Sequence, residues 1–276
     1  MSGLAGGGPL IDVHVHFQHA ASGRADWRED NARRLEIGKR IGITLHIASI
    51  LGSWGKTSPT YFPSPDDVTA GNAAMRAIAA EHPGLIGAYT TVNPNFTRHA
   101  LSEIAAGAAH GQLGIKLAAS RRASDPLLDP IGEVAAKHGL PVLQHIWQHR
   151  RGEVPGQEIS DALDLIALAK RHPAVAFILA HIGGGGDWSH SLRALENVPN
   201  VYVDLSGSGV DRGMLERSVA AVGPARLLWG TDLTMDTGLA KLRALAVLGM
   251  SADDLAAIRW KNAVRIFRLT TITDRP

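Results

Sequence analysis

The sequence predicts a single (β/α)8 (TIM) barrel, and three observations lead to this class. Short β-branched segments alternate with longer amphipathic segments along the whole chain. The length of 276 residues suits one large α/β domain or two small ones. The glycine motifs of nucleotide-binding open sheets are missing. We therefore expect a barrel over residues 10–270, after a flexible lead-in at residues 1–9, rather than a doubly wound open sheet.

The first predicted strand, LIDVHVHF, alternates aliphatic and polar residues. Because successive side chains of a strand point to opposite faces, Asp12, His14 and His16 are expected to share one face. In a barrel this face would be the inner one, and the aliphatic residues would pack against the outer helices. The predicted strands span residues 10–17, 42–51, 84–92, 112–119, 140–147, 175–182, 200–207 and 226–233.

The segments between the strands show the apolar spacing of helices. Residues 64–83 begin with Ser-Pro-Asp, which is typical of a helix start. Residues 159–173 repeat this design, with Ser160 as the expected N-cap and basic residues in the last turn. Residues 125–141 contain Gly139, which suits a left-handed C-cap. Each of these three helical segments therefore has a predicted beginning or end.

The composition excludes several classes of protein. Lys and Arg number 28 against 26 Asp and Glu, without a dense basic run, so we expect no nucleic-acid partner. The absence of cysteine excludes disulfides and thiolate metal sites. We find neither a secretory signal nor an apolar run of the ~18 residues that span a membrane. We expect a cytoplasmic protein, and a homodimer stays open.

Polar residues lie at the predicted carboxyl ends of the strands, where the active site of a barrel is built. Burying so many polar groups without partners would cost several kcal/mol, and a divalent cation would resolve this. Nitrogen and oxygen ligands without sulfur suit zinc, manganese, iron or cobalt. The residues concerned are His14, His16, Lys116, His145, His181, Asp204 and Asp232.

Six motifs give the chain a resemblance to a known family. They are DVHVH, GIKL, QHIW, AHIGGG, WGTDL and the closing KNAVRIFRL. In this order they resemble the amidohydrolase superfamily, and most closely its amidohydrolase-2 branch, which includes the aminocarboxymuconate-semialdehyde-type decarboxylases. The resemblance extends over essentially the whole chain. It implies a barrel with a metal site at the carboxyl ends of the strands.

The resemblance also implies residue roles. One divalent metal, zinc first and manganese second, would be bound by His14, His16, His145 and Asp232. His181 would act as a general base or polarising group beside a metal-bound water, whose pKa the metal lowers toward ~7. Asp232 would pass a proton between this water and the leaving group.

Further residues are expected near the substrate. Lys116, Arg121, Trp147 and Trp188 are candidates for substrate binding, and an arginine would favour a carboxylate-bearing small molecule. A carboxylated Lys116 bridging two metals, as in binuclear members, is the less favoured alternative.

Two carboxylates and a glycine run complete the predicted site. Asp204 is expected to form hydrogen bonds rather than bind the metal. Asp12 either orients a ligand or satisfies backbone donors. The glycines at 183–186 would let the backbone pass close to the site, with Asp187 capping the next helix.

Three functions are compatible with these motifs. The first is a metal-dependent hydrolase of a small lactone, ester or amide. The alternative is a metal-dependent, non-oxidative decarboxylase of an aromatic or unsaturated acid. The compact strand connections favour hydrolysis, because decarboxylases of this family tend to be longer. A non-catalytic descendant is disfavoured, since every expected ligand is present.

Overall fold

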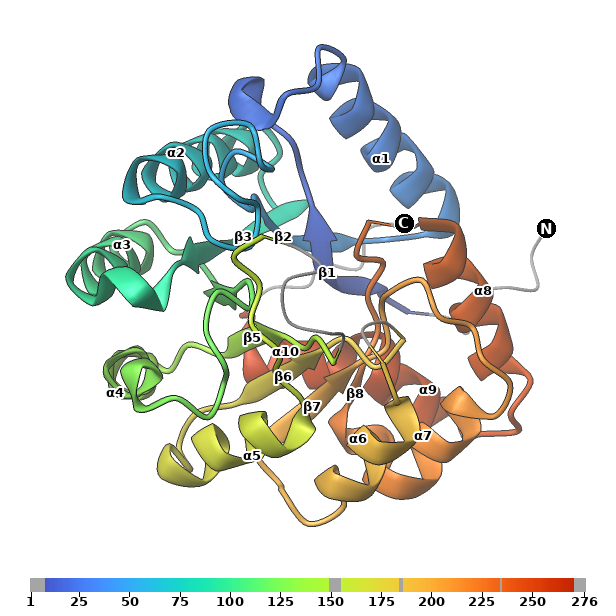
Figure 1. Cartoon of the computed structure of the whole chain (residues 1–276). Coiled ribbons are helices and arrows are strands. Elements are labelled where there is room, and N and C mark those ends of the chain that lie inside the picture. Colours follow the sequence, from blue (N-terminus) through green and yellow to red (C-terminus); the bar gives the residue numbers. More distant parts are fainter. Residues whose placement is uncertain (1–7, 149–154, 184–185, 234, 271–276) are drawn as a thin grey trace.

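The computed structural model describes residues 8–148, 155–183, 186–233 and 235–270. One parallel sheet has its eight strands in sequence order, and helices surround it (Figure 1). The predicted (β/α)8 barrel is therefore confirmed, and the open doubly wound sheet is excluded. Within the predicted lead-in at residues 1–9, residues 1–7 lie outside the described part. No helix of the described ranges is long and apolar enough to cross a membrane.

All eight predicted strands form, each within its predicted range. They are β1 (Ile11–His16), β2 (Leu45–Ser49), β3 (Ile86–Val92), β4 (Gly114–Leu117), β5 (Val142–His145), β6 (Phe177–Ala180), β7 (Val201–Asp204) and β8 (Leu227–Leu228). The predicted ranges were too long mainly because flanking apolar residues continue into buried loops. Asp232 lies beyond the end of β8 and belongs to the loop that follows it.

The helices confirm the alternating pattern. The α-helices are α1 (Trp27–Ile41), α2 (Pro65–Glu81), α3 (Thr97–Ala109), α4 (Asp129–His138), α5 (Ala162–Arg171), α6 (Trp188–Leu195), α7 (Met214–Val222), α8 (Met235–Ala246), α9 (Ala252–Ala256) and α10 (Asn262–Ile266). Short 3-10 turns are η1 (Ala20–Ser22), η2 (Pro94–Phe96), η3 (Pro126–Leu128) and η4 (Pro224–Arg226), and a π-helical turn is η5 (Ala257–Lys261).

The helix caps follow the sequence in three cases and differ in one. Ser64 caps α2, Asp187 caps α6, and Gly139 ends α4 in the left-handed conformation. The prediction that Ser160 caps α5 is wrong, because Asp161 is the N-cap. Asp161 also forms a capping box with Asp164. The Ser160 hydroxyl instead accepts a hydrogen bond from the backbone N–H of Ala123 at 3.0 Å.

A bulge in β1 changes which residues face the barrel interior. The pairing of β1 with β2 shifts between Asp12 and Val15. Ile11 and Val13 consequently pack in the interior cluster, while Val15 packs with the helix-facing cluster that contains Met75 of α2. The expectation that Asp12 shares a face with His14 and His16 is therefore wrong, since an extra residue in one strand reverses the alternation.

Asp12 instead faces outward and joins β1 to β2 and to the loop after β8. Its carboxylate accepts hydrogen bonds from the N–H of Thr231 at 3.0 Å and from the Thr231 hydroxyl at 2.7 Å. It also pairs with His46 Nδ1 of β2 at 3.3 Å. Asp12 thus accepts from one backbone N–H of the loop after β8 and also contacts the side chains of Thr231 and His46.

The core has an interior part and an outer part. The interior cluster combines inward residues of the strands with Ala263, Ile266 and Phe267 of the C-terminal segment, so this segment closes the end of the barrel opposite the strand ends. The outer clusters lie between strands and surrounding helices. The carboxyl ends of the strands are thus the end of the barrel left for a site.

The cap of α5 makes a stability prediction. Asp161→Ala should lower the free energy of unfolding by about 1 kcal/mol, because two backbone N–H groups at the start of α5 lose their acceptor. Urea unfolding followed by circular dichroism measures this. Leu163→Ala on the same helix, at a side chain that is 53% exposed, is the control and should change it by less than about 0.5 kcal/mol. Equal effects of the two substitutions would contradict the assigned cap.

Candidate metal centre and pocket

His14 is oriented by a carboxylate of β7, the strand that lies two places from β1 across β8. Its Nδ1 lies 2.6 Å from Asp204 Oδ2 of β7, and the Ser206 hydroxyl lies 3.1 Å from the same nitrogen. Both His14 and Asp204 are essentially fully buried. A proton on Nδ1 donated to the carboxylate leaves the lone pair on Nε2, which is the tautomer that a metal requires. Asp204 thus occupies the hydrogen-bonding position expected from the sequence.

His16 directs its Nε2 toward the Nε2 of His14. Its Nδ1 lies 3.0 Å from the Ser49 hydroxyl of β2, and its Nε2 lies 3.1 Å from His14 Nε2. The two nitrogens face each other although neither ring can be charged at low cost. Burial lowers the pKa of His16 to about 3, and burial together with Lys116 lowers the pKa of His14. Neutral imidazoles with converging lone pairs are suited to bind a cation.

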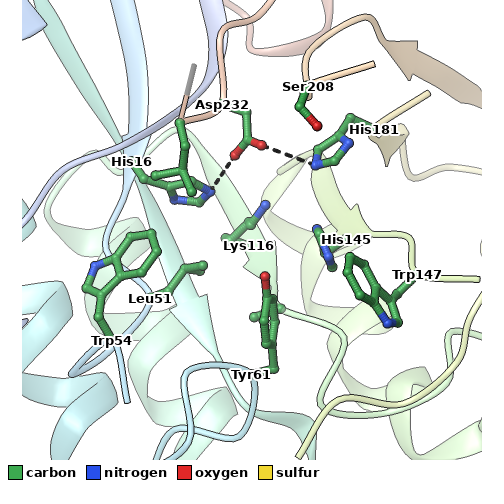
Figure 2. Close-up of a pocket in the computed structure, with 12 residues that line it drawn as sticks. His16, Leu51, Trp54, Tyr61, Lys116, His145, Trp147, His181, Ser208 and Asp232 are labelled. Carbon is green, nitrogen blue, oxygen red and sulfur yellow. Dashed lines mark ion pairs between the residues drawn. The ribbon is translucent and has the colours of Figure 1, made fainter. Parts of the chain in front are cut away.

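Asp232 supplies the carboxylate. Its Oδ1 lies 3.2 Å from His16 Nε2, and its Oδ2 lies 3.3 Å from His181 Nε2 (Figure 2). Burial raises the pKa of Asp232, but the neighbouring His16, His181 and His14 outweigh this effect and hold it well below its ordinary value. Asp232 is therefore an anion at neutral pH.

The backbone of Asp232 is held in an uncommon conformation, with φ at 55°. Its N–H donates to His14 O at 2.6 Å, and Arg34 of α1 donates to its carbonyl at 3.2 Å. A positive φ is costly for a residue other than glycine, so such contacts are needed to maintain it. They place the carboxylate next to both histidines.

The donor set fits a divalent metal. Among the described residues, one donor atom each from His14, His16 and Asp232 lie within 4.8 Å of one another. The cation Lys116 Nζ lies 2.8 Å from His14 Nε2, so a positive charge is already directed at this lone pair. A set of two imidazoles and a carboxylate suits zinc or manganese.

His145 lies beside this group rather than in it. It lines the same pocket, but its donor atoms are not part of the group within 4.8 Å. Its Nε2 is buried and has no hydrogen-bond partner in the described part of the chain. Burial, and then the neighbouring His181 and Lys116, hold the pKa of His145 well below its ordinary value. A buried neutral nitrogen without a partner is available to a ligand.

A pocket of about 220 Å³ opens over these donors (Figure 2). This is below the ~300–1,000 Å³ of sites for drug-sized ligands, so it suits a small molecule. Aromatic side chains form much of its wall. The described residues that line it are His16, Leu51, Trp54, Tyr61, Lys116, Ala118, His145, Trp147, His181, Ser208, Asp232 and Leu233.

The expected substrate residues divide into two groups. Lys116 and Trp147 line the pocket. Arg121 and Trp188 are not among the described residues that line it. Arg121 pairs with Asp125 at 3.2 Å, and the Trp188 indole donates to Asp211 at 2.9 Å. Arg121 lies in the loop after β4, and Trp188 is the first residue of α6. The strand pattern does not determine where either side chain points.

Sequence reasoning missed Tyr61 and Lys241. Tyr61 comes from the β2–α2 loop and lies against His145, with ring centroids 5.3 Å apart. Lys241 of α8 is buried and donates to the carbonyl groups of Ser206 and Gly207. A lysine in an amphipathic helix and a tyrosine in a polar loop carry no periodic signal, so the sequence offered no indication of either role.

Comparison with known proteins gives the family. The profile of the amidohydrolase family, in its second branch, matches residues 11–269. No curated protein is significantly similar in sequence. Among solved structures, 5-carboxyvanillate decarboxylase from Sphingomonas paucimobilis is 18% identical, with a TM-score of 0.69 over 95% of this chain and 99% of that one.

Two further structures show the same fold. A putative amidohydrolase from Staphylococcus aureus is 16% identical, with a TM-score of 0.73 over 95% of this chain and 100% of that one. A dihydroxybenzoic acid decarboxylase from a Polaromonas species, with bound manganese and the inhibitor 2-nitroresorcinol, is 16% identical, with a TM-score of 0.70 over 96% and 98%. At such identities these structures establish the barrel fold alone. The family profile covers almost the whole chain, and the chain therefore belongs to the amidohydrolase family, in its amidohydrolase-2 branch.

Proposed function

We propose that this protein is a metal-dependent, non-oxidative decarboxylase of a small aromatic or unsaturated carboxylic acid. The observation that carries the proposal is a metal-donor group beneath a small pocket with aromatic walls and one buried lysine. Structures with the same fold include decarboxylases of 5-carboxyvanillate and of dihydroxybenzoate, which are small aromatic acids.

In the sequence, the compact strand connections favour hydrolysis. Decarboxylases are among the solved structures of the same fold, and the carboxyvanillate decarboxylase aligns over 95% of this chain and 99% of its own, which favours decarboxylation. Hydrolysis of a lactone, ester or amide stays the second candidate, because the His181–Asp232 pair beside the donor group would serve either reaction.

We assign His14, His16 and Asp232 to the metal, with His145 as a fourth candidate ligand. Manganese and zinc both suit this set, and manganese is bound in a decarboxylase of the same fold. When bound, the metal would orient an anionic substrate and stabilise negative charge that develops during the reaction.

The protein's own side chains would do the rest. The Lys116 ammonium faces the pocket and would attract the substrate carboxylate. Burial lowers the pKa of Lys116 to about 8, and an anion beside it would favour its charged form. This arrangement supports a substrate-facing ammonium over a bridging carboxylated lysine.

His181 and Asp232 are assigned to proton transfer. Their polar atoms lie 3.3 Å apart, so the pair can hold one proton and release it toward the pocket. In a decarboxylation, the bond between the ring carbon and the carboxylate breaks, carbon dioxide leaves, and this proton is added to the same carbon. Trp54, Tyr61 and Trp147 would pack against a planar substrate, hold it in one orientation and limit the access of water.

The reaction class can be tested on the purified protein loaded with manganese or zinc. A panel of hydroxylated benzoic acids should release carbon dioxide, measured by a coupled carbonate assay, whereas a panel of aromatic lactones should remain unopened. Ring opening of lactones without carbon dioxide release would replace the proposal by hydrolysis. His181→Asn should lower kcat of the active substrate by at least about a hundredfold, the lower range for general acid–base catalysis.

Metal binding can be tested separately from activity. His16→Ala should lose nearly all bound metal, measured by elemental analysis, because one of the converging nitrogens is removed. Asp204→Asn should weaken metal affinity by about 10–100-fold, since the carboxylate that orients His14 is lost. His110→Ala, at an exposed histidine of the outer surface, is the control and should retain the wild-type metal content. Wild-type content in His16→Ala would contradict the assignment.

A further inference from the structure

We propose that Tyr61 contacts the substrate by donating a hydrogen bond from its phenol to the carboxylate, and that Asp67 is the positioning residue that holds it there. This inference rests on the proposed function for the chemistry of the ligand, since a carboxylate is its assumed feature. It concerns the β2–α2 loop at residues 50–64, which the metal chemistry does not use.

Tyr61 is directed into the pocket. Figure 2 shows its hydroxyl pointing toward Lys116, between Trp54 and His145. A tyrosine hydroxyl has an ordinary pKa of about 10, so it is a neutral donor at neutral pH. A neutral donor beside an ammonium is suited to bind one carboxylate with two hydrogen bonds.

The ring of Tyr61 is fixed by stacking. It lies nearly parallel to His145, with an interplanar angle of 26°. Trp147 stacks on the same imidazole at 5.9 Å between centroids. An aromatic side chain has few rotatable bonds, so a stacked tyrosine offers its hydroxyl at little cost in entropy. The position of the hydroxyl then depends on the conformation of the β2–α2 loop that carries Tyr61.

Asp67, in the first turn of α2, fixes this loop. Its carboxylate accepts hydrogen bonds from the hydroxyl groups of Thr57 and Ser58. The Ser58 hydroxyl in turn accepts from the N–H of Ser64 at 3.0 Å. The side chain of Asp67 is largely buried. One carboxylate therefore connects the middle of the loop with the helix that follows it.

The start of the loop packs on the same residue. Gly52 has φ at 59°, and a Cβ there would lie 2.8 Å from Pro63 Cβ and 3.4 Å from Asp67 Cβ. His19 Nε2 lies 2.9 Å from Gly52 O. Both ends of the loop are thus held close to Asp67, and the segment between them bears Trp54 and Tyr61. Loss of the Asp67 hydrogen bonds should loosen the pocket wall without affecting the metal donors.

The test is the binding of benzoate to the full-length, metal-loaded protein. Benzoate is a planar carboxylate, and its binding can be followed by tryptophan fluorescence because Trp54 and Trp147 line the pocket. Tyr61→Phe should weaken binding by about tenfold, the loss of one hydrogen bond to a charged group. Tyr202→Phe, on β7, should leave binding unchanged.

Asp67→Asn should weaken benzoate binding by at least about threefold, since its neutral side chain replaces a charged acceptor. Asp66→Asn, at the exposed neighbour in the same helical turn, is the matched control and should have no effect. The double variant Tyr61→Phe/Asp67→Asn should weaken binding by less than the product of the two single effects, because Asp67 acts in part through the Tyr61 hydroxyl. Metal content should equal that of the wild type in all variants.

Three outcomes would overturn the inference. Unchanged affinity in Tyr61→Phe would exclude the hydrogen bond. Fully additive effects in the double variant would exclude the positioning role of Asp67. Absence of benzoate binding by the wild-type protein would exclude carboxylate recognition by Tyr61, whereas the proposed function would be judged separately by carbon dioxide release from the acid panel.

Discussion

The junction between the first and last strands is the constraint on which the site depends. β8 has two residues, so the ladder alone closes little of the barrel. Closure is completed by the loop after β8, whose Thr231 and Asp232 N–H groups donate to His14 O at 3.2 and 2.6 Å. Asp12 reinforces this junction through Thr231. The same contacts that close the barrel therefore bring Asp232 to the two histidines of β1.

The buried charges around the site are arranged in opposing sets. Asp204 and Asp232 are anions, and Lys116 and Lys241 are the lysines whose charges act on them. Lys241 donates to Ser206 O at 2.9 Å and to Gly207 O at 2.5 Å, which ties α8 to the loop after β7. A Cβ at Gly207 would clash with His181 Nδ1, so this loop also limits the position of His181. A buried polar network is stable only when its members are paired in this way.

The residues around the pocket come from two kinds of element, and their expected roles differ accordingly. The candidate metal donors and the His181–Asp232 pair come from strand ends and from the loops that directly follow them, and rigid elements suit groups that need defined geometry. The β2–α2 loop supplies Trp54 and Tyr61, which would meet the variable part of a substrate. In a barrel, loops change more readily than strands, so chemistry and specificity can vary independently.

The sequence by itself determined the barrel, its eight strands and the histidines and carboxylates at the strand ends. These are local properties: strand periodicity, helix punctuation and the rule that parallel strands end at one edge. The tertiary structure alone decided three other features, which are the outward turn of Asp12, the separation of His145 from the close donor group, and the places of Tyr61, Asp67 and Lys241. The bulge in β1, the hydrogen bonds of the β2–α2 loop to Asp67 and the contacts of Lys241 all depend on tertiary packing. The periodicity of side chains along the sequence does not indicate such contacts.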